Sequence, residues 1–188
     1  MGTRINLLID HDLPDFRDVG EILARLEATL VAAGAVCDFW LTSEPDGSHI
    51  PQKSWEAIPE SPRRPGLRCF DGPGSLSLSV TASAARVRTG GRWRGFLANE
   101  AMRRVHLLAF RTIARVLGAS FMAIHADSDA VNDLFWGGRS AWECAERMEQ
   151  LWGPPEGSVE RVEARIVEAA GLYLPGSVWF LEDIRGEA

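Results

Sequence analysis

The chain has 188 residues and a formal charge of −6, and 46% of its residues are apolar and 24% are charged. This composition is close to the globular average, which excludes a disordered, collagen-like or coiled-coil chain, and the length suits a single globular domain over 1–188. The acidic balance argues against nucleic acid or an anionic membrane as the partner, and no apolar run approaches the ~20 residues that cross a bilayer.

The first third of the chain predicts a strand, a helix and a second strand. Residues 5–9 form an apolar run, and Asp15 is placed to cap a helix whose apolar residues recur at helical spacing until Gly34. The run 36–41 is again apolar and predicts a strand. From 43 to 66 the sequence contains five prolines and no sustained period, which predicts a long irregular loop.

The rest of the chain predicts alternating strands and helices. At least one strand pair is too close in sequence for a helical crossover, so we expect the α+β class, with a mixed or antiparallel sheet and helices packed mainly on one face. In chain order the pattern predicts a strand at 76–81, a hairpin at 86–95, a helix at 99–117, a strand at 121–125, a short helix capped by Asp127 or Ser128, a helix at 140–152 that begins with a Ser-x-x-Glu capping box, a helix at 158–170 and a strand at 178–181.

Charge is strongly segregated along the chain. Residues 1–62 carry 4 basic and 11 acidic groups, residues 63–115 carry 11 basic and 2 acidic groups, and residues 116–188 carry 5 basic and 13 acidic groups. Two interpretations of the basic middle remain open. Either the acidic flanks fold against it, or its arginines meet an external anionic partner, which would be an acidic protein patch or a phosphate.

The arginines of the basic middle predict two rows of positive charge. If 89–91 form a three-residue turn, Arg88 faces Arg92 across a hairpin. Arg86 then faces Arg94, and four guanidiniums share one face, whereas a two-residue turn would scatter them. Like charges opposite one another are unfavourable, so we expect an anionic surface to cover this face. A second row on the predicted helix repeats at spacings of seven and four, which aligns on one flank Arg104, Arg111 and Arg115.

Two predicted strands end in histidine and carboxylate residues, the strand at 5–9 and the strand at 121–125. If these strands are neighbours, their ends could bring together the ligands of a divalent cation for a metal-dependent hydrolase. Both segments also precede predicted helices, where Asp and Ser are the preferred capping residues, and we favour capping. The side chains in question are Asp10, Asp12, His125 and Asp127.

Tryptophan supplies further candidate contact residues, because tryptophan and arginine most often anchor protein interfaces. Trp55 lies in the predicted irregular loop, where it could contact a partner or equally hold its own loop in place. Trp136 and Arg139 flank Gly137-Gly138, which indicates a position near the surface. The predicted partner-binding set is therefore Trp55, Arg86, Arg88, Arg92, Arg94, Trp136 and Arg139.

One segment resembles a known family. It reads Phe135-Trp136-Gly137-Gly138-Arg139-Ser140-Ala141-Trp142-Glu143-Cys144-Ala145-Glu146-Arg147. This stretch resembles the Trp-Gly-x-Arg-x-Ser-x-x-x-Cys-Ala-x-Arg segment of some bacterial polymorphic-toxin immunity proteins. The resemblance implies a non-catalytic cytoplasmic protein that binds and neutralises one cognate toxin, and it does not indicate which residues touch that toxin.

The motifs that would identify an enzyme are missing from the sequence. No Gly-x-Ser-x-Gly nucleophile motif and no phosphate-binding glycine loop is present, and the three cysteines form neither a disulfide framework nor a Cys-x-x-Cys pair. We therefore predict a cytoplasmic, non-catalytic protein without a cofactor, an immunity or inhibitor protein that covers a toxin or another enzyme. The alternatives are the metal-dependent hydrolase and a small-molecule or nucleotide binder that uses the Arg86–Arg94 hairpin.

Overall fold

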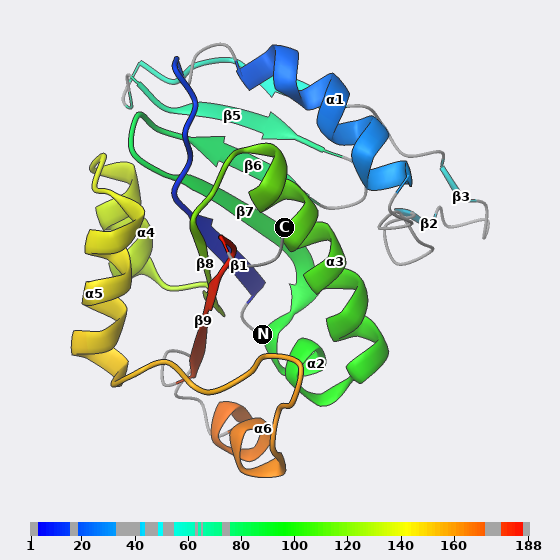
Figure 1. Cartoon of the computed structure of the whole chain (residues 1–188), viewed down its shortest axis with the longest axis vertical. Helices are drawn as coiled ribbons and strands as arrows, with labels where there is room; N and C mark the ends of the chain where they lie inside the picture. Colours follow the sequence, from blue (N-terminus) through cyan, green and yellow to red (C-terminus); the bar gives the residue numbers. More distant parts are fainter. Residues whose placement is uncertain are drawn as a thin grey trace.

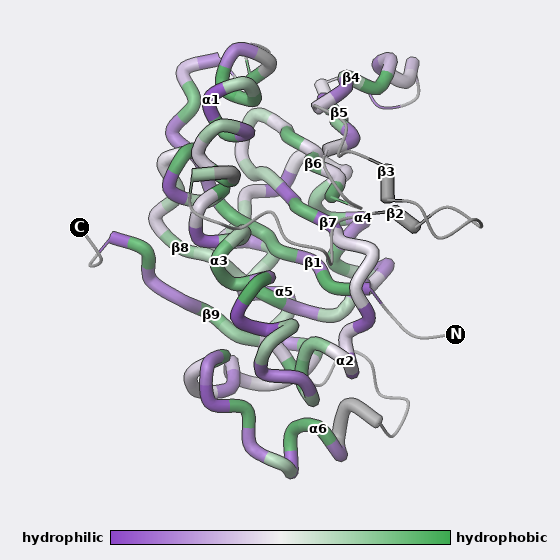
Figure 2. Tube along the Cα trace, turned by 90° about the vertical axis from the view of Figure 1, so that its right-hand side faces the viewer, coloured by the Kyte–Doolittle hydropathy of each residue, from purple (hydrophilic) through white to green (hydrophobic). Residues whose placement is uncertain are grey.

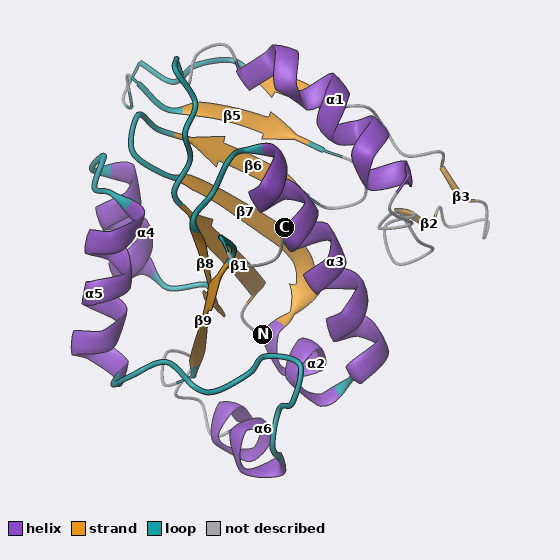
Figure 3. Cartoon of the chain, in the orientation of Figure 1, coloured by secondary structure: helices purple, strands orange, loops and turns teal. Residues whose placement is uncertain are grey.

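A computed structural model describes residues 4–15, 19–32, 42–43, 49–50, 55–62, 64, 66–72, 76–171 and 178–185. Its centre is one seven-stranded antiparallel sheet in the order β4-β5-β6-β7-β1-β8-β9, so the predicted α+β class is confirmed (Figures 1 and 3). The strands are β1 (Arg4–Ile9), β4 (Glu56–Ile58), β5 (Arg68–Asp71), β6 (Ser77–Val80), β7 (Ala85–Arg92), β8 (Phe121–Ala126) and β9 (Trp179–Asp183), with a separate pair β2 (Thr42–Ser43) and β3 (His49–Ile50).

Helices cover both faces of this sheet. They are α1 (Val19–Ala32), α2 (Trp93–Ala98), α3 (Glu100–Val116), α4 (Asp129–Trp136), α5 (Ala141–Trp152) and α6 (Ala164–Gly171). In Figure 1, α1 and α3 lie in front of the sheet, and α4 and α5 lie together at one side. No helix within the described ranges is long and apolar enough to cross a membrane.

Two cores form because alternate residues of a strand point to opposite faces of the sheet. On β1, Ile5, Leu7 and Ile9 enter a larger core that α1, α2, α3 and α6 cover, whereas Leu8 enters a smaller core beneath α4 and α5. The helices thus pack mainly on one face, as predicted. Hydrophobic residues concentrate in β1 and β8, while α3 mixes hydrophobic and hydrophilic positions (Figure 2). Each fully buried aliphatic side chain stabilises the fold by about 1.5–3 kcal/mol.

The helix predicted at 99–117 is confirmed as α3. The side chain of Asn99 accepts a hydrogen bond from the backbone N–H of Met102 at 3.0 Å, which caps the first turn. Gly118 follows the helix with φ of 70°, a left-handed conformation that glycine adopts without steric cost. Phe110 and Ile113 are fully buried against the sheet, so the opposite flank of α3 faces outward.

The predicted arginine hairpin is wrong. β7 continues through Gly90-Gly91, and α2 begins directly afterwards at Trp93. Because β6 pairs with one edge of β7 and β1 with the other, the glycine pair makes no turn. It lies where the register between β1 and β7 shifts, so the two glycines are the extra residues of a bulge. The predicted facing pairs therefore do not form, neither Arg86 with Arg94 nor Arg88 with Arg92.

Three further predictions differ from the structure or lie beyond it. Part of the segment predicted to be irregular, 43–66, forms the edge strand β4, and its partner β5 was also not predicted. The helix predicted from Ser158 begins at Ala164. The strand predicted at 36–41 lies outside the described residues. β4 and β5 have too few residues to show a period in the sequence, so only their pairing with neighbouring strands identifies them as strands.

Substitution of Gly91 by alanine should destabilise the protein by about 1–3 kcal/mol, because a Cβ atom at this position overpacks the core. It would lie 2.8 Å from Ile5 Cδ1 and 2.8 Å from His106 Nε2. Urea denaturation followed by tryptophan fluorescence measures the change. Gly157→Ala is the matched control, because no heavy atom lies within 4 Å of its added methyl group. Equal stability of the two variants would contradict the close packing of Ile5 and His106 around Gly91.

Candidate functional site

The four predicted metal ligands lie at opposite ends of the sheet. β1 and β8 are neighbours, but they run antiparallel, so the end of one strand lies beside the start of the other. Asp10 accepts hydrogen bonds from the backbone N–H groups of Ser120 and Phe121, at 2.8 and 3.2 Å. Asp127 follows β8 instead, where its backbone N–H donates to the carbonyl of Arg4 at 2.9 Å. The prediction of one site is therefore wrong for Asp10, Asp12, His125 and Asp127.

The other described residues do not form a metal site either. Within those ranges, no group of three or more His, Cys, Asp or Glu side chains is arranged to hold a metal ion. Asp12 lies beside Gly118 at the end of α3, and its backbone N–H donates to the carbonyl of Leu117 at 3.2 Å. Asp10 and Asp12 thus join the end of β1 to the turn between α3 and β8.

Asp127 is the centre of a polar cluster between the sheet and α4. One carboxylate oxygen accepts hydrogen bonds from the side-chain amides of Asn6 and Asn132, at 2.9 and 2.8 Å. The other oxygen accepts from Arg88 at 2.9 Å, and Arg86 donates to Asn132 Oδ1. We call these five residues the α4 polar cluster. The carboxylate of Asp127 therefore ties α4 to β1 and β7, and neither it nor Ser128 caps the helix through its side chain.

The α4 polar cluster places two guanidiniums beside one carboxylate. Burial opposes ionisation of Asp127, but the hydrogen bonds from the two asparagines and the charges of the two arginines outweigh it and lower the pKa of this carboxyl. Arg86 lies beneath the rings of Phe135 and Trp136, whose centroids are 5.2 and 5.1 Å from its guanidinium carbon. Burial lowers the pKa of Arg86. Since Arg86 is only 8% exposed, its prediction as a partner contact is wrong.

The two candidate tryptophans pack against their own chain. Trp55 packs on the larger core and its ring covers Gly72, which supports the interpretation that it holds its own loop in place. Arg64 covers the ring of Trp136, with its guanidinium carbon 3.9 Å from the ring centroid. Such a cation–π contact stabilises by about 0.5–1 kcal/mol at an exposed site. Both indole rings thus contribute to local structure.

The remaining predicted contact residues are spread over β7, α2 and the segment before α5. Arg88 is half-buried in the α4 polar cluster, whereas Arg92 is exposed at the end of β7 and Arg94 is exposed in α2. Arg139 is exposed before α5 and pairs with Glu143 at 3.0 Å. The structure therefore does not bring the predicted partner-binding set together on one surface.

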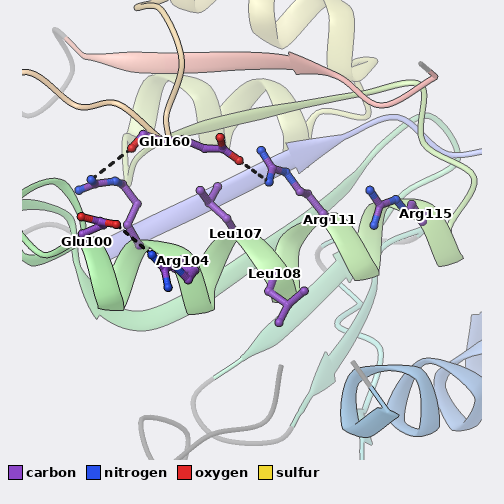
Figure 4. Close-up of a pocket in the computed structure, with 8 residues that line it drawn as sticks. Glu100, Arg104, Leu107, Leu108, Arg111, Arg115 and Glu160 are labelled. Atoms are coloured by element: carbon purple, nitrogen blue, oxygen red, sulfur yellow. Dashed lines mark hydrogen bonds and ion pairs between the residues drawn. The ribbon is translucent and has the colours of Figure 1, made fainter. Parts of the chain in front are cut away.

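An open groove runs along the outward flank of α3 and encloses about 570 Å³ (Figure 4). Leu107 lies at its base, and the neighbouring Leu108 is 37% exposed. The flank predicted from the spacings of seven and four residues forms one side of the groove, so that prediction is confirmed. The lining residues are Glu100, Arg103, Arg104, Leu107, Leu108, Arg111, Arg115 and Glu160.

Arg111 is held in the groove by two carboxylates. Its Nε and one terminal nitrogen both donate to Glu182 on β9, at 3.1 and 3.0 Å, and its other terminal nitrogen donates to Glu160 at 2.8 Å. Burial opposes the charge of Arg111, but its bonds to Glu160 and Glu182 outweigh this and raise its pKa. Arg104 pairs with the exposed Glu100, at 3.0 Å. An exposed ion pair of this kind contributes about 0–1 kcal/mol.

The groove combines residues that the sequence analysis found with residues that it missed. The basic flank was visible as a periodic pattern in one helix. Glu160 and Glu182 come from the acidic C-terminal part of the chain, so the sequence signalled them only as members of an acidic region. These two glutamates and Asp127 form ion pairs with arginines of the basic middle. This supports the interpretation that part of the positive charge is neutralised within the fold.

Comparison of the chain with protein-family models, with curated proteins and with solved structures finds no match. The function must therefore be inferred from the geometry of the chain. The α4 polar cluster is largely closed beneath a helix, whereas the α3 groove is open to solvent and carries four arginines against two glutamates. We take the α3 groove as the candidate functional site.

Proposed function

We propose that the chain is a non-catalytic cytoplasmic protein that binds another protein and covers its surface, as an immunity or inhibitor protein does. The observation that carries this proposal is the α3 groove, where arginines align on one helix flank around an exposed leucine. Arginine anchors with an apolar neighbour are typical of the residues that contribute most to protein interfaces.

The charge distribution supports the same proposal. The lining of the α3 groove carries two more positive than negative groups, on a chain whose total charge is −6. A partner with an acidic patch would be attracted to this groove and repelled by the acidic remainder, which orients the encounter. Glu182 on β9 already holds Arg111, so the side chain of this arginine needs little ordering when a partner binds.

The segment that resembles immunity proteins lies away from this groove. It forms the end of α4 and the first part of α5, on the face of the sheet opposite α3. Within it, Ser140 and Glu143 form the predicted capping box, and Cys144 is buried. Burial raises the pKa of the Cys144 thiol to about 11, which makes it unreactive at neutral pH. We therefore assign this segment a structural role in the proposed binding protein.

Reversing two charges of the α3 groove tests the proposed function. We expect the double variant Arg104→Glu with Arg115→Glu to bind the partner at least about tenfold more weakly, because each reversal opposes an acidic surface. The tagged full-length chain is purified from its own cells, the stoichiometric partner is identified by mass spectrometry, and its dissociation constant is measured by calorimetry.

The matched control is Arg25→Glu with Arg147→Glu, which reverses two exposed charges on α1 and α5 that do not line the groove. This control should bind the partner as the native chain does. Recovery of no stoichiometric protein partner, or equal binding by the groove variant and the native chain, would count against the proposal.

A further inference from the structure

We propose that the carboxylate of Glu160 occupies, inside the α3 groove, the position that a carboxylate of the partner takes in the complex. This inference rests on the proposed function and adds the chemistry of the partner, an acidic segment with an apolar side chain. It also assigns Glu160 the role of an internal competitor that the partner must displace.

Arg111 is already oriented to bind a carboxylate of the partner in place of that of Glu160. Two of its three guanidinium nitrogens donate to Glu182, whose side chain is only 18% exposed and extends from the edge strand β9. The third nitrogen points into the groove and reaches Glu160 (Figure 4). Because Glu182 keeps the guanidinium in place, a carboxylate that replaces Glu160 meets a donor that is already oriented.

Glu160 is held less firmly than Arg111. Its side chain is 58% exposed, and it lies in the non-helical segment between α5 and α6. Its backbone carbonyl accepts a hydrogen bond from Arg103 at 3.4 Å, and its carboxylate accepts one from Arg111 at 2.8 Å. A half-exposed pair of this kind contributes at most about 1 kcal/mol, so a partner with several carboxylates can displace it.

The positions of the arginines determine which kind of segment can bind in the groove. Arg104 and Arg115 lie seven residues before and four residues after Arg111, which corresponds to about 10 Å and about 6 Å along the helix axis. Leu108 is exposed between Arg104 and Arg111. An acidic helix with glutamates at the same spacings, and with one leucine between them, matches this pattern of charge and apolar surface.

The test uses a fluorescein-labelled, alanine-based helical peptide with glutamates at spacings of seven and four residues and one leucine between them. Fluorescence anisotropy gives its dissociation constant for the full chain. We expect Glu160→Gln to bind the peptide about two- to fivefold more tightly, because the competing carboxylate is lost. Glu182→Gln should bind it more weakly, because Arg111 loses its support. Glu163→Gln is the control, since Glu163 pairs with Arg165 and does not line the groove.

The possible results separate this inference from the proposed function. If Glu160→Gln binds the peptide no more tightly than Glu163→Gln, or if a single-stranded oligonucleotide displaces the peptide from the native chain, the inference is wrong. The proposed function would still stand if a protein partner depends on Arg104 and Arg115. If the peptide result is as expected but no protein partner is recovered, the inference about groove chemistry holds and the proposed function fails.

Discussion

Replacement of Asp127 by alanine should lower the free energy of unfolding by about 2–4 kcal/mol, one of the two largest effects that we expect. The substitution removes the acceptor for Asn6, Asn132 and Arg88 at once. It also removes the negative charge of Asp127 that favours the charged form of the buried guanidinium of Arg86. The side chain of Asp127 is 22% exposed and that of Arg88 is 37% exposed, so solvent screening keeps the loss below that of a fully buried pair.

Two comparisons isolate the role of the Asp127 charge. Asp127→Asn keeps the shape of the side chain and one acceptor, so it should lose less stability than the alanine variant. Asp133→Ala removes an exposed carboxylate from the same helix and should change stability by less than about 0.5 kcal/mol. Urea denaturation at neutral pH measures all three. A loss for Asp127→Ala as small as that for Asp133→Ala would show that the α4 polar cluster does not hold α4 on the sheet.

The second large effect is a loss of stability in mild acid caused by His125. Burial is the main cause that lowers the pKa of this histidine to about 4; the contact with the carbonyl of Ala126 and the charge of Asp127 oppose the shift, and the charge of Arg86 adds to it. In the unfolded chain the imidazole binds a proton near pH 6.5. Between these two values the unfolded state holds the additional proton, so stability falls as the pH falls. Over the whole interval the loss amounts to about 3 kcal/mol.

The variant His125→Gln tests this origin of the acid sensitivity. Its free energy of unfolding should depend less steeply on pH between about pH 6.5 and about pH 4 than that of the native chain. Burial also lowers the pKa of His106, so a smaller slope of the same sign remains in the variant. Asp127 acts at lower pH, because its pKa lies below the ordinary value. If the free energy of unfolding of the variant and of the native chain changed with pH to the same extent, His125 would not be the cause of the acid sensitivity.

Helix α3 illustrates what sequence reasoning can determine. Its cap at Asn99, its end near Gly118 and the shared flank of its three arginines all follow from contacts within a few residues along the chain. The capping box of Ser140 and Glu143 is equally local, and it forms as predicted. These features were accessible because a helix satisfies its hydrogen bonds within one segment.

The glycine pair shows where local reasoning fails. Gly90-Gly91 in a polar, arginine-rich sequence is typical of a hairpin turn, yet both residues lie within β7. What decides between turn and bulge is the presence of β1, from far earlier in the chain, along the edge of β7. Asp10 and Asp127 were misplaced for a related reason, since the sequence does not show whether neighbouring strands run parallel or antiparallel.

The sequence by itself determined the α+β class, the capped starts of α3 and α5, the basic flank of α3 and the excess of acidic groups at both ends of the chain. Only the tertiary structure decided which acidic groups meet which arginines. It placed Arg86 beneath α4, and it brought Glu160 and Glu182 to Arg111 from positions distant in sequence. Periodicity specifies the face of one element, whereas the partner of that face depends on strand order and chain direction, which arise only when the whole sheet assembles.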